Sequence, residues 1–170
     1  TDVGDIVYPR VYTMGNQSET IAYTMNMTYP IAPAPTGFME KFPIASDADA
    51  NVINNSGLSV KRIGLSAQSS AENGYFSGGQ NPVGGQPTNI IERFPFASET
   101  NQLDVGDLTL STGWAGGTQS ETHGYMTGGQ GPTPPYSNRY NKIEKFSFSN
   151  DENGTDVGDL TVYLTSPANQ

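Results

Sequence analysis

The sequence contains no cysteine, which excludes disulfides and thiolate metal ligands from its fold and chemistry. Positive charge is also scarce, because 8 Lys and Arg stand against 17 Asp and Glu, for a net charge of −9. The resulting field repels polyanions, so binding to nucleic acid or to an anionic membrane surface is disfavoured. No apolar run approaches the ~20 residues of a membrane-spanning helix, and no membrane insertion is expected.

Glycine and proline are plentiful, at 20 and 12 residues, and many Asn, Ser and Thr lie between them. These residues break helices and bound short strands, so the composition predicts a turn-rich, all-β chain. The chain begins with Thr1 and shows no signal peptide, and we expect it to be processed or cut from a longer polypeptide.

Three sequence elements recur in the same order with a period near 50 residues. Asp-Val-Gly-Asp stands at residues 2–5, 104–107 and 156–159, with a degraded copy at 55–58. A Glu-Lys/Arg-Phe element stands at residues 40–47, 92–99 and 144–151. Gly-Tyr followed by Gly-Gly-Gln stands at 74–80 and 124–130, with a drifted copy at 22–27, and Gln-Ser pairs precede these at 17–18, 68–69 and 119–120. A repeat of this length predicts one four-stranded propeller blade per unit.

The third unit indicates where the strands of a blade should lie. Alternation at residues 108–111 predicts a strand that Gly116 and Gly117 break, and residues 123–127 predict a second strand that ends at a double glycine. Residues 142–148 predict a third strand, with either a bulge near Lys145 or a bend at Ser147, where the other two repeats have Pro43 and Pro95. We expect a turn at residues 149–154, after which Asp156 opens the next unit.

A short strand ending in Gly-Gly, a variable loop and a strand carrying an aromatic residue together resemble the kelch repeat. The matching double glycines are Gly78-Gly79 and Gly128-Gly129. The residues near the kelch aromatic position are Phe42, Phe94 and Phe146. The later Trp of a standard kelch repeat is missing, so the chain resembles a divergent kelch-like set. The sequence pattern of the repeats is also similar to that of repeats in long structural proteins of marine and cyanobacterial bacteriophages.

The resemblance implies a single propeller segment over residues 1–170, with about three blades of a larger or oligomer-completed propeller. The repeats are roughly 2–54, 55–103 and 104–155, plus the start of a fourth at 156–170. Propellers typically close with four to eight blades, so we expect further repeats of the same chain or another subunit to complete the arc. The aromatic residues expected to fill the space between blades are Tyr23, Tyr75 and Tyr125 with the three phenylalanines.

No constellation of residues typical of an enzyme is present in the sequence. His123 is the only histidine, and the four arginines occupy non-equivalent positions in the repeats. Glu40, Glu92 and Glu144 recur at one position of each repeat, which indicates a structural role. The acidic turns lack a ligand loop of known spacing for Ca²⁺. We therefore expect no catalytic residue, no cofactor and no metal site.

The variable loops at residues 28–37, 80–88 and 130–139 fall at the same place in each repeat, so we expect them on one face of the propeller. The candidate residues for contacting a ligand or partner are Tyr29, Pro82, Pro134, Pro135 and Tyr136. Aromatic and proline side chains on such a face could stack on sugars or pack on a protein.

These observations favour a non-enzymatic structural or adhesion protein of a bacteriophage particle, located in a tail fibre or surface appendage. The expected partners are a host-surface glycan or other virion proteins, and the expected location is the virion or the extracellular space. A carbohydrate-binding propeller of a secreted bacterial protein is one alternative. A kelch-type adaptor that binds a protein partner is another.

Overall fold

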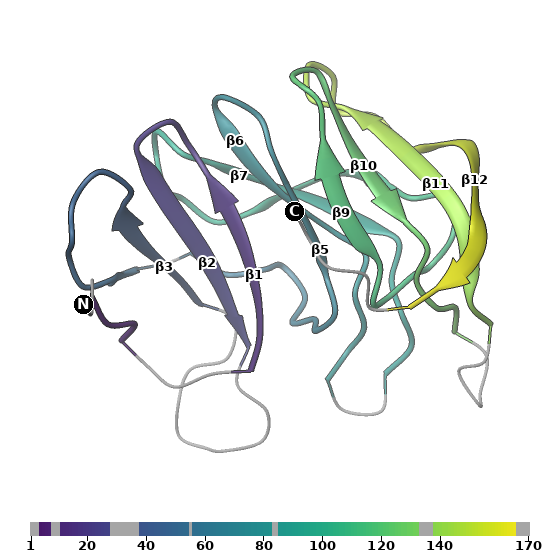
Figure 1. Ribbon diagram of the computed structural model, residues 1–170, viewed down its shortest axis with the longest axis horizontal. Coiled ribbons are helices and arrows are strands. Elements are labelled where there is room, and N and C mark those ends of the chain that lie inside the picture. The colour runs from purple at the N-terminus through teal and green to yellow at the C-terminus, as the bar shows by residue number, and fades with distance from the viewer. Residues whose placement is uncertain are drawn as a thin grey trace.

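The computed structural model describes residues 4–7, 11–27, 38–54, 56–82, 85–132 and 138–165. These residues form three four-stranded sheets, which stand side by side in chain order (Figure 1). The first sheet contains β1 (Val11–Gln17), β2 (Ile21–Met27), β3 (Phe38–Pro43) and β4 (Asn51–Ile53). The second contains β5 (Ser66–Ser69), β6 (Asn73–Ser77), β7 (Ile90–Pro95) and β8 (Leu103–Asp107). The third contains β9 (Gly116–Gln119), β10 (His123–Thr127), β11 (Tyr140–Ser147) and β12 (Thr155–Leu164).

Each sheet is an antiparallel meander in which every strand pairs with the next one along the chain. The prediction of an all-β fold built from four-stranded antiparallel sheets is confirmed. The sheets pack together in a manner consistent with propeller-like blades, and among the described residues they do not close into a barrel. β5 contacts both β1 and β9, so the first strands of the three sheets are neighbours (Figure 1).

The hydrophobic core lies in two layers between the sheets. The first layer joins Tyr23 and Met25 of the first sheet to Phe76 and Phe94 of the second. The second layer joins Tyr75 and other residues of the second sheet to residues of the third. Side chains alternate between the two faces of a strand, so neighbouring Tyr75 and Phe76 on β6 enter different layers. The second sheet is therefore covered on both faces.

The strand expected at residues 108–111 is absent, and that expectation was wrong. Leu108 is buried in the second core layer, and the backbone N–H of Thr109 donates to the carboxylate of Glu144 at 2.9 Å. The segment is a connection between sheets. Its apolar and polar residues alternate because Leu108 packs in the core while Thr109 binds Glu144. The expected break at Gly116 and Gly117 is instead the start of β9, where a Cβ on Gly117 would lie 2.5 Å from the carbonyl oxygen of Ala67 on β5.

The Asp-Val-Gly-Asp copies open the sequence repeats, but they do not open the sheets. Residues 104–107 lie in β8 and residues 156–159 in β12, the last strands of their sheets, so the sheets are offset from the sequence repeats. Each Asp carboxylate that starts these two copies accepts from the N–H of the glycine two residues later, at 3.3 Å. This local contact holds the copy in shape while the strand pairs with its neighbour.

The other predictions for the third unit hold more closely. β10 covers the expected residues 123–127, and β11 covers most of 142–148. The irregularity expected near Lys145 lies instead on the partner strand, because Ile143 pairs with Gly158 and Glu144 with Asp156. One extra residue of β12 thus lies opposite this point of β11, and a second irregularity lies between Tyr140 and Lys142. Ile143 and Phe146 lie on opposite faces of the sheet because they are an odd number of residues apart.

Candidate functional site

Aromatic residues join neighbouring sheets in the same way at both junctions. The Tyr23 ring of the first sheet stacks on Phe96 of the second, with centroids 4.8 Å apart, and meets Phe94 edge-on at 5.4 Å. The Tyr75 ring of the second sheet stacks on Phe148 of the third at 4.7 Å and lies 5.6 Å from Phe146. Such pairs contribute about 0.5–1.5 kcal/mol beyond the area that they bury.

An ion pair accompanies the aromatic residues at each junction. Lys41 of β3 binds Glu99, which follows β7, with 2.5 Å between Nζ and Oε2. Arg93 of β7 binds Asp151, which follows β11, with 2.6 Å between Nη1 and Oδ1. In both cases the basic residue belongs to one sheet and the acidic residue to the next sheet along the chain. Each sheet therefore carries a basic residue for the sheet that follows it and an acidic residue for the sheet that precedes it.

Buried amides form a third link between the sheets. Nδ2 of Asn16 on β1 donates to the carbonyl oxygens of Gln68, at 2.5 Å, and Tyr75, at 3.2 Å. Nε2 of Gln68 on β5 donates to the carbonyl oxygen of Tyr125 at 3.0 Å. The predicted equivalence of the Gln-Ser pair at 68–69 is therefore wrong, since Ser70 is the residue that accepts in the β5–β6 turn while Gln68 reaches the next sheet.

The double glycines end β6 and β10 at a close approach of backbone. Gly78 and Gly128 have φ of 64° and 67°, which L-residues with side chains rarely adopt. A Cβ on Gly78 would lie 2.3 Å from the carbonyl oxygen of Thr112, and one on Gly128 would lie 2.8 Å from that of Leu164. The following glycines, Gly79 and Gly129, donate to those same carbonyls at 2.8 and 2.7 Å. The crowding comes from Thr112, which follows the fourth strand of the second sheet, and from Leu164, which ends the fourth strand of the third sheet.

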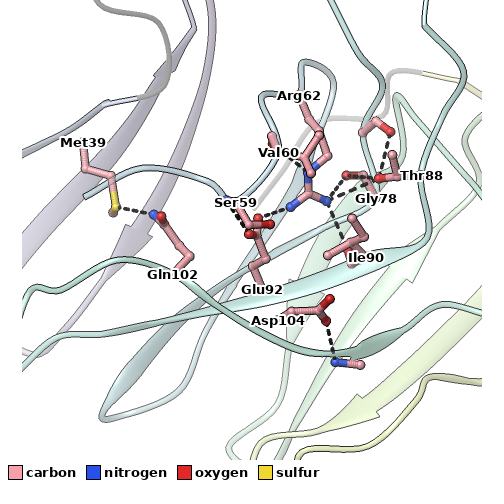
Figure 2. Close-up of polar contacts among 12 residues, drawn as sticks. Met39, Ser59, Val60, Arg62, Gly78, Thr88, Ile90, Glu92, Gln102 and Asp104 are labelled. Atoms are coloured by element: carbon pink, nitrogen blue, oxygen red, sulfur yellow. Dashed lines mark hydrogen bonds and ion pairs between the residues drawn. The ribbon is translucent and has the colours of Figure 1, made fainter. Parts of the chain in front are cut away.

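The recurring residues Glu92 and Glu144 are buried anchors for the connections between sheets, and Figure 2 shows the contacts of Glu92. Glu92 on β7 accepts from the backbone N–H of Ser59 at 2.7 Å and pairs with Arg62. Glu144 on β11 accepts from the backbone N–H of Thr109 at 2.9 Å and from its hydroxyl at 2.5 Å. Each carboxylate thus holds the chain segment that enters its own sheet from the preceding one.

Arg62 satisfies its buried guanidinium group almost entirely with backbone (Figure 2). Its Nη1 donates to the carbonyl oxygens of Gly78 at 2.6 Å and Ile90 at 3.1 Å, and its Nη2 binds Glu92. Burial lowers the pKa of Arg62, and the charge of Glu92 opposes that shift. The pair is fully used in joining β6, β7 and the preceding connection, which leaves little capacity for a ligand.

The two outer sheets lack a neighbour on one side. Phe42 and Tyr125 occupy the positions of Phe94 and Tyr75, yet both are only half-buried, whereas Phe94 is 0 % and Tyr75 2 % exposed. Ile44, which corresponds to Phe96, is 50 % exposed. The structure therefore brings Tyr75 together with Phe146, but among the described residues Phe42 and Tyr125 have no aromatic partner across a junction.

The variable loops follow β2, β6 and β10, which end at the same edge of their sheets (Figure 1). Among the candidate loop residues, Pro82 is described, and it is half-buried after β6. The candidates Tyr29, Pro134, Pro135 and Tyr136 lie outside the described residues.

His123 starts β10, where its Nδ1 lies 2.8 Å from the hydroxyl of the exposed neighbour Thr122. In the described part of the chain, no group of three His, Asp or Glu side chains lies close enough to hold a metal ion. No helix of the length and apolar character needed to cross a membrane occurs among the described residues. The charged side chains that form ion pairs in the described residues use them for contacts within and between sheets.

Arg62, Asn16 and Gln68 are the important residues that sequence reasoning missed. Gln68 belongs to a recurring Gln-Ser pair and Arg10 stands 52 residues before Arg62, but these spacings do not show what the side chains contact. The acidic residues of the ion pairs were visible, because Glu99 and Asp151 end the second repeated element.

No protein-family profile matches the chain, and no curated protein sequence matches it.

Proposed function

We propose that this chain is a non-enzymatic structural or adhesion protein, a divergent kelch-like propeller segment of a bacteriophage virion. Its place would be a tail fibre or a surface appendage, where it presents loops to a host-surface glycan or to other virion proteins. Further repeats of the same chain, or other subunits, would complete the arc of sheets.

The observation that carries this proposal is that the recurring buried polar groups serve the scaffold. Glu92 and Glu144 anchor the connections, and Arg62 binds carbonyl oxygens of its own sheet. A rigid scaffold of this kind supports function in the loops that it presents. Since β2, β6 and β10 end at one edge, the three variable loops all leave from that edge and offer one surface to a partner.

Immunogold electron microscopy tests the virion role, using an antibody raised against this segment and particles from the source sample. Label at tail tips would support receptor binding, and label on the capsid or tail tube would support a decorating role. An antibody against an unrelated protein is the control. The absence of label from every particle would overturn the virion proposal, and binding to a glycan panel would then be the test of the secreted carbohydrate-binding alternative.

A further inference from the structure

The outer faces of the first and third sheets each carry one half of a junction. The third sheet presents Tyr125 on β10 and Lys145 on β11, which correspond to Tyr75 and Arg93 of the second sheet. Among the described residues, Lys145 has no carboxylate within ion-pair distance. The face of the second sheet that carries Tyr75 and Arg93 is covered by the third sheet. Among the described residues, no sheet covers the face of the third sheet that carries Tyr125 and Lys145.

The first sheet presents the complementary half. Phe42, Ile44 and Asp47 correspond to Phe94, Phe96 and Glu99, which receive the tyrosine and the lysine of the preceding sheet. Asp47 is exposed and has no cationic partner in the described part of the chain. A groove of about 360 Å³ lies along the inner strand β1, next to this face, and is lined by residues of all three sheets, among them Phe42, Ala67 and Gln119.

We infer that a second copy of this chain docks head to tail, with its first sheet against the third sheet of the first copy. Tyr125 of one copy packs on Phe42 and Ile44 of the other, and Lys145 binds Asp47. The contact is heterologous, because it joins two different faces. When each chain uses both of its faces, two such contacts close a ring of two chains, provided that the rotation between the copies permits closure. Six sheets lie within the usual range of four to eight blades. The inference deepens the proposed completion of the arc and rests on that part of the proposed function.

Continuity with the internal junctions argues for a second copy rather than an unrelated partner. The two faces already have matched shape and charge, because each repeats one side of a contact that the chain makes twice within itself. Electrostatic complementarity of this kind favours one partner and one orientation.

Among the described residues, the last strand, β12, also lacks the neighbour that its equivalent β8 has, and this indicates how the third sheet of one copy meets the first sheet of the other. A Cβ on Gly106 of β8 would lie 2.6 Å from the carbonyl oxygen of Glu152 in the next sheet, whereas one on Gly158 of β12 would meet nothing within 4 Å. The equivalent place on the first sheet is held by Gly4, whose Cβ would lie 2.6 Å from the carbonyl oxygen of Ala48. Residues 1–5 and 155–159 have the same sequence, so Gly158 of one copy can take the place beside Ala48 that Gly4 holds in the other copy, which displaces Gly4 and Asp5 from their own first sheet.

Sedimentation velocity at micromolar to near-millimolar concentrations tests the proposal with the whole chain. The wild type should form dimers. Lys145→Glu alone and Asp47→Lys alone should each raise the dimer dissociation constant by about tenfold or more, because each places like charges opposite one another in both contacts. An equimolar mixture of the two variants should dimerise again, since every contact in the mixed dimer then joins a lysine to a carboxylate.

Lys61→Glu is the matched control, because it changes net charge as Lys145→Glu does but lies in the exposed connection between the first two sheets. It should leave the dimer intact, whereas Tyr125→Ala should weaken it. A monomeric wild type, an equal effect of Lys61→Glu, or a mixture that stays monomeric would overturn the proposal. A wild type that dimerises but whose dimer ignores all the face variants would also overturn it and place the contact elsewhere. These results do not depend on where antibody labels a particle, so the virion role stands or falls separately.

Discussion

The two internal junctions keep the same glutamate anchor but surround it with different polar chemistry. At the junction of the first and second sheets, Glu92 pairs with Arg62, and both side chains are 0 % exposed. At the junction of the second and third sheets, Glu144 binds Thr109, while the nearest cation is the partly exposed Lys142, with 3.9 Å between Nζ and Oε1. The comparison teaches that the repeat conserves the carboxylate and its hydrogen bond from a backbone N–H of the preceding connection. The other partner of the carboxylate differs between the junctions.

Removing the cation at the first junction should have the largest effect. Arg62→Ala leaves Glu92 buried without its countercharge, and breaking a buried pair in this way costs about 3–5 kcal/mol of unfolding free energy. Urea unfolding measures the loss. Arg93→Ala removes a pair that is partly exposed and should cost below about 1 kcal/mol. Equal losses for the two variants would contradict the distinction between a buried anchor and a surface pair.

Two equivalent tyrosines allow a second test, because one is covered and the other is not. Tyr75→Ala should lower the free energy of unfolding by about 3–4 kcal/mol, since its ring is 2 % exposed and stacked on Phe148. Tyr125→Ala should lower it by only about 1 kcal/mol at concentrations where the chain is monomeric. A loss for Tyr125→Ala as large as that for Tyr75→Ala would show that its ring is already packed within one chain.

The second junction can be weakened selectively through Thr109. Thr109→Val removes the hydroxyl that donates to Glu144 at 2.5 Å but keeps the backbone N–H that donates at 2.9 Å. We expect a loss of about 1–2 kcal/mol in unfolding free energy, because a hydrogen bond to a charged group is lost while the carboxylate keeps one donor. Thr118→Val, at an exposed site on β9, is the control and should change little. If the two variants unfold with the same free energy, the hydrogen bond from Thr109 to Glu144 does not stabilise this junction.

The smallest expected effect is the pH dependence that Tyr23 gives to the junction of the first and second sheets. Burial and the nearby carboxylate of Glu99 raise the pKa of Tyr23 to about 12 from its ordinary 10.0. The folded chain therefore holds this proton more tightly than the unfolded chain, so the stabilisation is complete below pH 10 and is lost as pH rises toward about 12. Tyr23→Phe should reduce that alkaline loss in urea unfolding at a series of pH values. An unchanged profile would contradict the role of Tyr23.

The sequence predicted the repeat and the strand class because both depend on local pattern. β10 was predicted correctly, since His123 to Thr127 is bounded by a turn and by the double glycine. The expected strand at 108–111 failed because alternation cannot distinguish pairing in a strand from anchoring in a connection, where Leu108 is buried and Leu110 is 37 % exposed.

Contacts between sheets were beyond the reach of pattern reasoning for a different reason. Arg62 reaches Glu92 across 30 residues, and Gln68 reaches Tyr125 across 57 residues, and a local pattern carries no signal for contacts between residues so far apart. The aromatic positions were visible as repeated residues, but which face of a sheet each one enters became clear only from the strand register.

Chemical crosslinking tests most directly whether the outer faces repeat the internal junction. The chain has no cysteine, so two introduced cysteines and a short bismaleimide report on one pair of sites. Arg93→Cys with Asp151→Cys should crosslink within one chain, and Asp47→Cys with Lys145→Cys should yield covalent dimers on a denaturing gel. If the internal pair reacts and the outer pair leaves only single chains, the outer faces do not meet and the account is contradicted.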